Sequence, residues 1–335
     1  MDRSVARGLA NGVFRSCREA RTTESMLDLT RQLAAFTETR KSRQAAEAFH
    51  ARVKAHAAAH PGYFGYRHRG FGLSARKSLS TFLLASGIDS DRVIAKESED
   101  LEETFRFTAN SLLVGKTGAT WLERSLPVSV SLHALARYFM RGGGEPDGGG
   151  AFFLGCVRWG MLVGNALRGI GMKNVPILCP LGEGAVLGLT SPFDAGTSEQ
   201  RVEFRDGAAT VFSDVPLARR MLAESHGASL TSPDLGVDFR TFIHRGQMAP
   251  SQVRLCDAMA ALLADHGRAV EATVHALLFE SDHTVLLGVT EDLHAALMAL
   301  QKALLDLFTE DYWTAIRGPK GSRLLEVEGL FEDGE

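Results

Sequence analysis

The spacing of apolar residues indicates helices in the first part of the chain. In residues 23–36 and 40–59 apolar side chains recur every three or four positions, which predicts two amphipathic helices. Residues 74–86 and 100–113 show the same spacing and predict two more. The segment VSVSLHALARYFM (128–140) is typical either of a strand that runs into a helix or of a helix throughout.

The pattern changes after a run of glycines, GGGEPDGGG at 142–150, which predicts a long loop or a hinge. A helix is expected over 152–167. Short apolar runs broken by Gly, Pro and Asp-Gly then predict a series of strands, VPILCPL, GAVLGLTSPF, QRVEFRDG and AATVFSD. The elements expected beyond them are helices over 214–224, 250–267 and 291–308 and a hairpin around Asp282.

These elements predict an α+β fold, with a predominantly helical N-terminal half and a mixed β-sheet plus helices in the C-terminal half. The expected divisions of the chain are a basic N-terminal arm (1–22), a helical region (23–141), the Gly-rich loop or hinge (142–150), an α/β region (151–325) and an acidic tail (326–335).

Composition points to a cytoplasmic protein with no membrane partner. The most apolar stretch, residues 151–170, contains two arginines and an asparagine, which is too polar for a lipid-facing span. The N-terminus lacks the apolar core of a secretory signal. Cys17, Cys156, Cys179 and Cys256 are far apart and form no CxxC pair, so we expect reduced, mostly buried thiols and no zinc framework.

The distribution of charge is the strongest functional signal. Residues 1–80 contain fifteen basic and six acidic side chains, a net charge of +9, whereas the rest of the chain has 22 basic and 34 acidic ones, a net charge of −12. Arginine dominates the basic segment, and its planar guanidinium pairs with phosphate and stacks on bases. The segment therefore predicts nucleic-acid binding, although docking on the acidic body or on a neighbouring subunit, or an acidic protein or membrane partner, would also fit.

An aromatic and basic run, YFGYRHRGF at 63–71, strengthens the nucleic-acid interpretation. Aromatic side chains such as Tyr63, Phe64 and Tyr66, interleaved with arginine, are what a surface that tracks a backbone and stacks bases requires. The predicted RNA-binding residues are Arg3, Arg7, Arg15, Arg18, Arg21, Arg40, Lys41, Arg43, Tyr66, Arg67, Arg69, Arg76 and Lys77.

Signatures of catalysis are weak. Residues 110–117, NSLLVGKT, approach a P-loop, but Asn110 replaces the first glycine, and Gly115 is more simply the end of a helix. A nucleotide phosphohydrolase that uses Lys116 is therefore a minor alternative. His56 and His60 could share a helix face, but no third metal ligand is near them in the sequence. We expect no catalytic residue, cofactor or metal.

Four stretches of the C-terminal half resemble the non-structural single-stranded-RNA-binding protein of orthoreoviruses and aquareoviruses, called sigma-NS in the former. Their order and spacing match over residues 152–330, while the middle of the N-terminal half matches poorly and the chain is shorter than its relatives. The stretches are VPILCPLGEGAVLGLTSPF with the following AATVFSDVPLARRML, then RGQMAPSQVRLCDAMAALL, EDLHAALMALQKALLDLF and WTAIRGPKGSRLLEVEGL.

This resemblance implies an oligomer that binds single-stranded RNA with little sequence preference and remodels it without ATP in cytoplasmic viral factories. It implies that the N-terminal arm contacts both RNA and other subunits, a role that would carry over to Arg3, Arg7, Arg15 and Arg18. A factory matrix protein would be a further partner. A viral shell or nucleocapsid subunit, whose basic arm faces the genome, is the main alternative.

Overall fold

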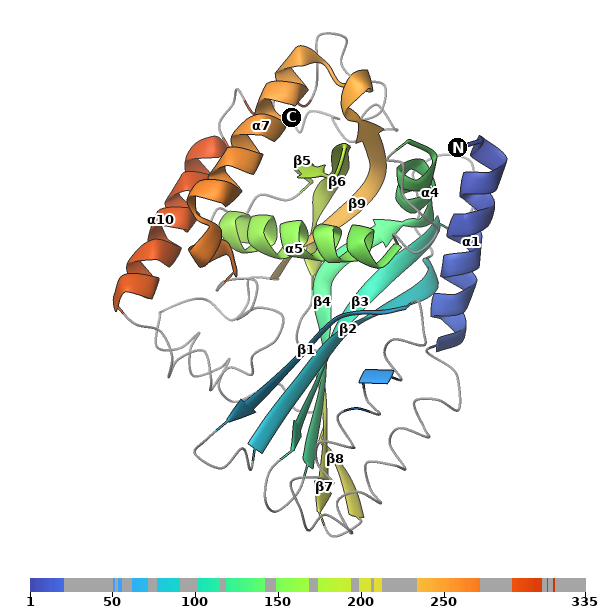
Figure 1. The fold of residues 1–335 in the computed structure, drawn as a ribbon, viewed down its shortest axis with the longest axis vertical. Coiled ribbons are helices and arrows are strands. Elements are labelled where there is room, and N and C mark those ends of the chain that lie inside the picture. The colour runs from blue at the N-terminus through green and yellow to red at the C-terminus, as the bar shows by residue number, and fades with distance from the viewer. Residues whose placement is uncertain are drawn as a thin grey trace, which may run out of the picture.

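The computed structural model describes residues 1–20, 51, 54–55, 62–71, 77–90, 102–114, 119–141, 149–168, 174–193, 199–205, 208–212, 234–271, 291–308, 312 and 316. The fold is α+β, as the sequence predicts (Figure 1). The elements in chain order are α1 (Arg3–Ala20), β1 (Tyr63–Phe71), β2 (Lys77–Ser90), β3 (Glu102–Val114), β4 (Ala119–Ser131), α4 (Leu132–Arg141), α5 (Gly149–Arg168), β5 (Pro176–Leu181), β6 (Gly184–Phe193), β7 (Glu199–Arg205), β8 (Ala208–Phe212), β9 (Asp234–His244), the 3-10 turn η3 (Arg245–Gln247), α7 (Pro250–Asp265) and α10 (Glu291–Leu307).

The strands form one nine-stranded mixed sheet that branches at β4. β1 to β4 make an antiparallel meander. The first half of β4 pairs with β7, where Ala119 lies opposite Phe204, and its second half pairs in parallel with β9, where Val130 lies opposite Phe239. β9 continues through β6 to β5, and β8 extends the sheet from β7. The β7–β8 hairpin thus projects at one end, and the helices gather at the other (Figure 1).

Residues 74–86 and 100–113, which the sequence predicts to be helical, instead lie in or next to the strands β2 and β3. In the part of β2 from Phe82 to Gly87 the residues are buried on both faces of the sheet, so its apolar residues run almost without interruption. Such a run also satisfies the three- and four-residue spacing of a helix. In β3, alternation is visible, because Phe105 and Phe107 face the helices while Thr104 and Thr108 face the other side.

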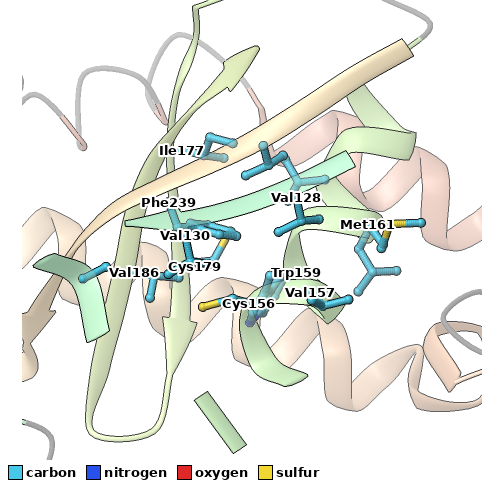
Figure 2. Packing of buried hydrophobic residues seen from close by; sticks show 14 of the residues in the cluster. Val128, Val130, Cys156, Val157, Trp159, Met161, Ile177, Cys179, Val186 and Phe239 are labelled. Atoms are coloured by element: carbon cyan, nitrogen blue, oxygen red, sulfur yellow. The ribbon is translucent and has the colours of Figure 1, made fainter. Parts of the chain in front are cut away.

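The α5 helix lies across the sheet and forms the centre of the core (Figures 1 and 2). Its side chains are buried around most of the helix, which explains why its apolar stretch is long. Gly160 allows close contact with the sheet, because a Cβ atom there would lie 2.6 Å from Val128. Trp159 is 3% exposed, and its indole nitrogen donates a 2.6 Å hydrogen bond to the carbonyl of Pro180. Trp159 therefore anchors α5 in the core.

Most elements predicted after residue 128 are present. The segment 128–140 is a strand that runs into a helix, and the predicted strands are β5 to β8. The predicted helices over 152–167, 250–267 and 291–308 are α5, α7 and α10. The strand β9 is not among the predicted elements. Several predicted elements fall outside the described residues, namely 23–36, 214–224, the Gly-rich run up to 148 and the hairpin around Asp282. Most of 40–59 also lies outside them, although residues 51, 54 and 55 are helical.

The four cysteines are buried and unpaired with one another, as expected. Burial raises the pKa of Cys17 to about 12 and that of Cys256 to about 11, so these thiols stay protonated at neutral pH. The edge strand β5 is covered by Tyr312, whose hydroxyl lies 3.1 Å from the backbone nitrogen of Leu178. No helix within the described ranges is both long and apolar enough to cross a membrane.

Candidate nucleic-acid interface

The basic N-terminal segment, predicted as an arm over residues 1–22, forms a docked helix over residues 3–20. Ala6, Ala10, Phe14 and Cys17 recur at three- and four-residue intervals and are buried in the common core. This stripe packs against α4 and β2. The ring of Phe14 meets that of Phe105 edge to face, with centroids 5.4 Å apart.

The contact between α1 and β2 depends on Gly87. A Cβ atom at this position would lie 2.7 Å from the backbone oxygen of Phe14 and 3.1 Å from two carbons of its ring. The backbone oxygen cannot rotate away as a side chain can, so a larger residue would displace the helix. Glycine at 87 therefore sets how closely α1 approaches the sheet.

The arginines of α1 lie along one side of the helix, next to its buried stripe. Arg3, Arg7, Arg15 and Arg18 are all exposed. At 3.6 residues per turn, the four positions fall within about 120° of the helix circumference. Asp2 starts the helix, since its carboxylate accepts a 2.8 Å hydrogen bond from the backbone nitrogen of Ser4. The hydrogen bonds from Ser4 lower the pKa of this carboxyl.

The second basic element is α4, which lies beside α1 (Figure 1). Its buried side includes Leu135 and Phe139. A different face carries His133, Arg137 and Arg141 at intervals of four residues, so the three side chains follow one another along the helix.

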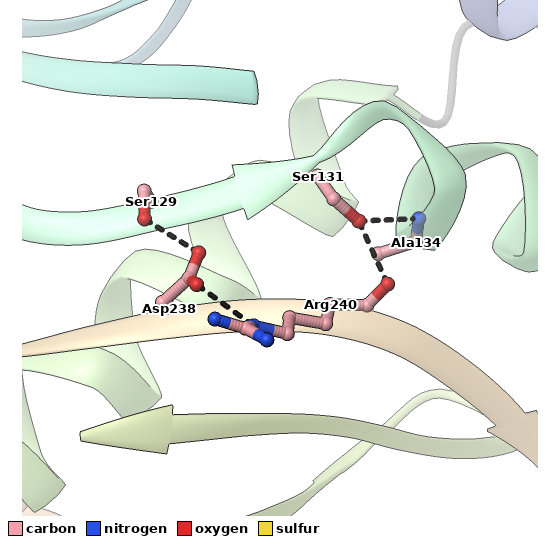
Figure 3. Close-up of polar contacts among 5 residues, drawn as sticks. All are labelled: Ser129, Ser131, Ala134, Asp238 and Arg240. Atoms are coloured by element: carbon pink, nitrogen blue, oxygen red, sulfur yellow. Dashed lines mark hydrogen bonds and ion pairs between the residues drawn. The ribbon is translucent and has the colours of Figure 1, made fainter. Parts of the chain in front are cut away.

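A polar junction at the branch of the sheet fixes the start of α4 (Figure 3). The Ser131 hydroxyl accepts a 3.1 Å hydrogen bond from the backbone nitrogen of Ala134, which caps the helix, and donates a 2.7 Å hydrogen bond to the carbonyl of Arg240 in β9. Two residues earlier in each strand, the Asp238 carboxylate accepts from the Ser129 hydroxyl at 2.7 Å and from the Arg240 side chain at 3.0 Å. The junction orients α4 relative to the sheet.

The two helices enclose a basic cleft of about 260 Å³ where they meet the ends of β3 and β4. We call this the α1–α4 cleft. Its lining residues are Arg3, Arg7, Glu103, Ser131, Leu132, His133, Ala136, Arg137 and Met140. Among them Glu103 alone is acidic. Arg141 lies close enough to add its field to that of the other arginines at His133.

The cleft favours the neutral form of His133. Burial, followed by the positive charges of Arg137, Arg3, Arg141 and Arg7, lowers the pKa of His133. The Arg137 Nε lies 3.3 Å from the His133 Nε2 and donates a hydrogen bond to it, which requires that nitrogen to be unprotonated. The imidazole therefore orients the guanidinium of Arg137. Burial and Arg137 also lower the pKa of Arg141.

The structure brings only some of the predicted RNA-binding residues into this region. Arg3 and Arg7 line the cleft, and Arg15 and Arg18 continue the same side of α1. Tyr66, Arg67 and Arg69 lie in β1, and Lys77 begins β2; Tyr66 is half-buried. The predicted residues outside the described ranges are Arg21, Arg40, Lys41, Arg43 and Arg76.

Two aromatic residues considered as base platforms are core residues instead. Tyr63 is 7% exposed and Phe64 is 8% exposed. The ring of Tyr63 packs edge-on against Phe82, with centroids 5.2 Å apart, and Phe64 packs in the same way against Phe107 at 5.8 Å. Neither ring can stack on a base without leaving the core.

The P-loop alternative lacks its structural context. Asn110 and the four residues after it belong to β3, and Val114 lies opposite Ala119 of the antiparallel strand β4. A P-loop connects a strand to a helix, whereas this segment connects two paired strands. The interpretation of Gly115 as a helix end also fails, because the element before it is a strand; Lys116 itself is outside the described residues.

The pattern of the sequence does not single out His133, Arg137, Arg141 or Glu103. The only signal was the four-residue spacing HALARYFMR, which becomes informative once α4 is known to be a helix. Within the described residues, no group of three or more His, Cys, Asp and Glu side chains could hold a metal ion, while His56 and His60 lie outside them. No family model, curated protein or solved structure matches this chain.

Proposed function

We propose that this protein binds single-stranded RNA with little sequence preference, through the α1–α4 cleft and the adjoining arginines of α1. The observation that carries the proposal is the convergence of Arg3, Arg7 and Arg137, from two different helices, on a cleft whose described lining includes one carboxylate. Clustered guanidinium groups pair with phosphate oxygens and carry no preference for a base. The resemblance of the C-terminal half to a viral RNA-binding family supports the same function.

Binding would depend strongly on salt. If Arg3, Arg7, Arg137 and Arg141 each neutralise one phosphate, counterion release from a single strand gives a slope of about 2.8 in log affinity against log salt. Affinity would then fall about fifty-fold between about 50 and 200 mM salt.

Remodelling of RNA needs no ATP under this proposal. A protein that binds single strands and not duplexes shifts the equilibrium toward single strands by mass action. The same chain would act as an oligomer, in keeping with the family that it resembles, so several clefts would hold one RNA strand and raise the overall affinity.

The decisive experiment compares charge-matched double variants of the full chain. Arg3→Ala/Arg7→Ala removes two cleft arginines, and Arg254→Ala/Arg268→Ala removes two exposed arginines in and just after α7, on another part of the surface. Fluorescence anisotropy with a labelled single strand of about 20 nucleotides, titrated with salt, gives the affinity and the slope for each.

We expect the cleft variant to lose affinity and to lower the salt slope by about 1.4, while the control keeps the wild-type values. Equal behaviour of the two variants would refute the cleft as the RNA site. Absence of binding by the wild-type protein at low salt would refute the function. Deletion of residues 1–22 is a poor test, because it also removes the core residues of α1.

A further inference from the structure

We propose that the α1–α4 cleft, which also accepts an internal phosphate, binds a phosphate monoester most tightly, the group at the end of an RNA strand. This inference rests on the proposed function and deepens it. The site is formed by Arg3 and Arg7 of α1, Arg137 of α4 and His133, which orients Arg137.

Charge favours the monoester. An internal phosphodiester carries a single negative charge, whereas a monoester carries about −1.5 to −2 near neutral pH and offers three acceptor oxygens. Three guanidinium groups line the cleft, and Glu103 is the acidic residue among the described lining. The surplus of positive charge therefore matches a dianion better than a monoanion.

The shape of the site points the same way. The arginines converge on one cleft of about 260 Å³, which is slightly below the usual range of about 300–1,000 Å³ for sites that enclose drug-sized ligands. A surface that tracks an internal backbone spaces its cations along a groove. Convergence on a small volume suits one highly charged group, while Arg15, farther along α1, lies outside the cleft lining and is free to serve the rest of the strand.

The cleft is built before any ligand arrives. The Ser131 cap and its bond to β9 fix the start of α4, and the Phe14 and Gly87 contact fixes α1 on the sheet. The hydrogen bond from Arg137 to His133 restricts one of the arginine side chains. Preorganised donors lose little conformational freedom on binding, so each contact contributes more of its energy to affinity.

Binding to this site should also involve a proton. The groups that act on His133 are Arg3 and Arg7 from α1 and Arg137 and Arg141 from α4, with Glu103 of β3 also lining the cleft. A bound dianion opposes the field of the arginines and favours the protonated imidazole. Both ring nitrogens of the protonated form are donors, so the hydrogen bond from Arg137 belongs to the ligand-free cleft. Proton uptake on binding, measured by calorimetry in buffers with different ionisation enthalpies, should disappear in His133→Gln.

The test uses one RNA sequence prepared with a 5′-phosphate, with a 3′-phosphate and with hydroxyl groups at both ends. The variants are Arg137→Ala, within the cleft, and Arg15→Ala, an exposed arginine outside its lining. We expect a strand with a terminal phosphate to bind the wild-type protein about tenfold more tightly, or better, than the hydroxyl strand. Arg137→Ala should remove this difference, and Arg15→Ala should weaken all strands alike.

Competition with adenosine monophosphate and with inorganic phosphate tests whether the cleft binds a nucleotide monoester or free phosphate. Competition by either supports the site, and no competition even at high concentration counts against it. Equal affinity for all three strands, with each still dependent on Arg137, would overturn the terminal-phosphate site and leave RNA binding intact. If adenosine monophosphate binds but none of the RNA strands does, the proposed function is overturned and the monoester site remains. Binding of none would overturn both.

Discussion

Truncation of Phe14 tests whether α1 belongs to the folded body. Phe14 is 5% exposed and meets Phe105 at a centroid distance of 5.4 Å, so Phe14→Ala removes a buried ring and an edge-to-face contact. Buried Phe→Ala substitutions cost about 3–5 kcal/mol, of which the ring pair contributes about 0.5–1.5. We expect the low end, about 3 kcal/mol, because α1 lies at the edge of the fold and can partly collapse into the space.

The assay is urea unfolding of Phe14→Ala with Val5→Ala as a matched control. Val5 lies on the same helix but is 53% exposed, so its truncation should change stability by less than about 0.5 kcal/mol. The midpoint of Phe14→Ala should move to lower urea with an unchanged slope if the chain unfolds in one step. A separate early transition in wild-type protein, lost in Phe14→Ala, would mean that α1 unfolds alone. Two variants of equal stability would refute the docking of α1.

Three further outcomes follow from single contacts. Ser131→Ala should lower the free energy of unfolding by about 1–3 kcal/mol in thermal or urea unfolding, because it removes the α4 cap and leaves a β9 carbonyl unpaired. Ser131→Thr keeps a hydroxyl and should recover part of that loss of stability. Trp159→Phe should cost about 2 kcal/mol or more, since the Pro180 carbonyl loses its donor; a near-neutral change would contradict that bond. Burial and Arg137 lower the pKa of His133, so the folded chain binds fewer protons than the unfolded chain as the pH falls from about 6.5 to the lowered pKa. His133 should therefore make stability fall over this range. His133→Gln should remove that part of the pH dependence, and an identical pH profile would contradict it.

The sequence predicted the elements whose pattern has one interpretation. The helix at 250–267 begins with a proline in its first turn, and the observed α7 starts at Pro250. The strands β5 and β6 are bounded by turn residues, and Gly182, in the left-handed conformation, makes the turn between them. Local chemistry determined these elements, so a single sequence was enough.

The prediction failed where burial on both sides removed the alternation of a strand. The described part of β2 between Phe82 and Gly87 is buried throughout, and its leucine and alanine content favours a helix. Its strand state comes from β1 and β3, which pair with it on either side. The local sequence contains no information about those neighbours, so tertiary pairing overrides its helical propensity.

Half of the candidate site could be predicted from charge alone. Arg3 and Arg7 stand out in a segment rich in arginine, and they do line the cleft. Arg137 and His133 do not stand out, because they lie far from the basic segment in the sequence, among apolar residues typical of a hydrophobic core. They become part of the site only because the apolar stripe of α1 docks beside α4, a long-range contact that spacing and composition do not encode.

The docked helix bears on two interpretations of the basic N-terminus. If its charge served to attach the segment to the acidic body, carboxylates should lie opposite the arginines. Instead α1 is attached through Ala6, Ala10 and Phe14, and its first two arginines lie beside Arg137, with Glu103 as the acidic residue among the described lining. Like charges held close together destabilise the folded state, and burial lowers the pKa of the histidine among them. An anionic ligand would relieve that repulsion, which favours the proposal that the charge of α1 serves ligand binding.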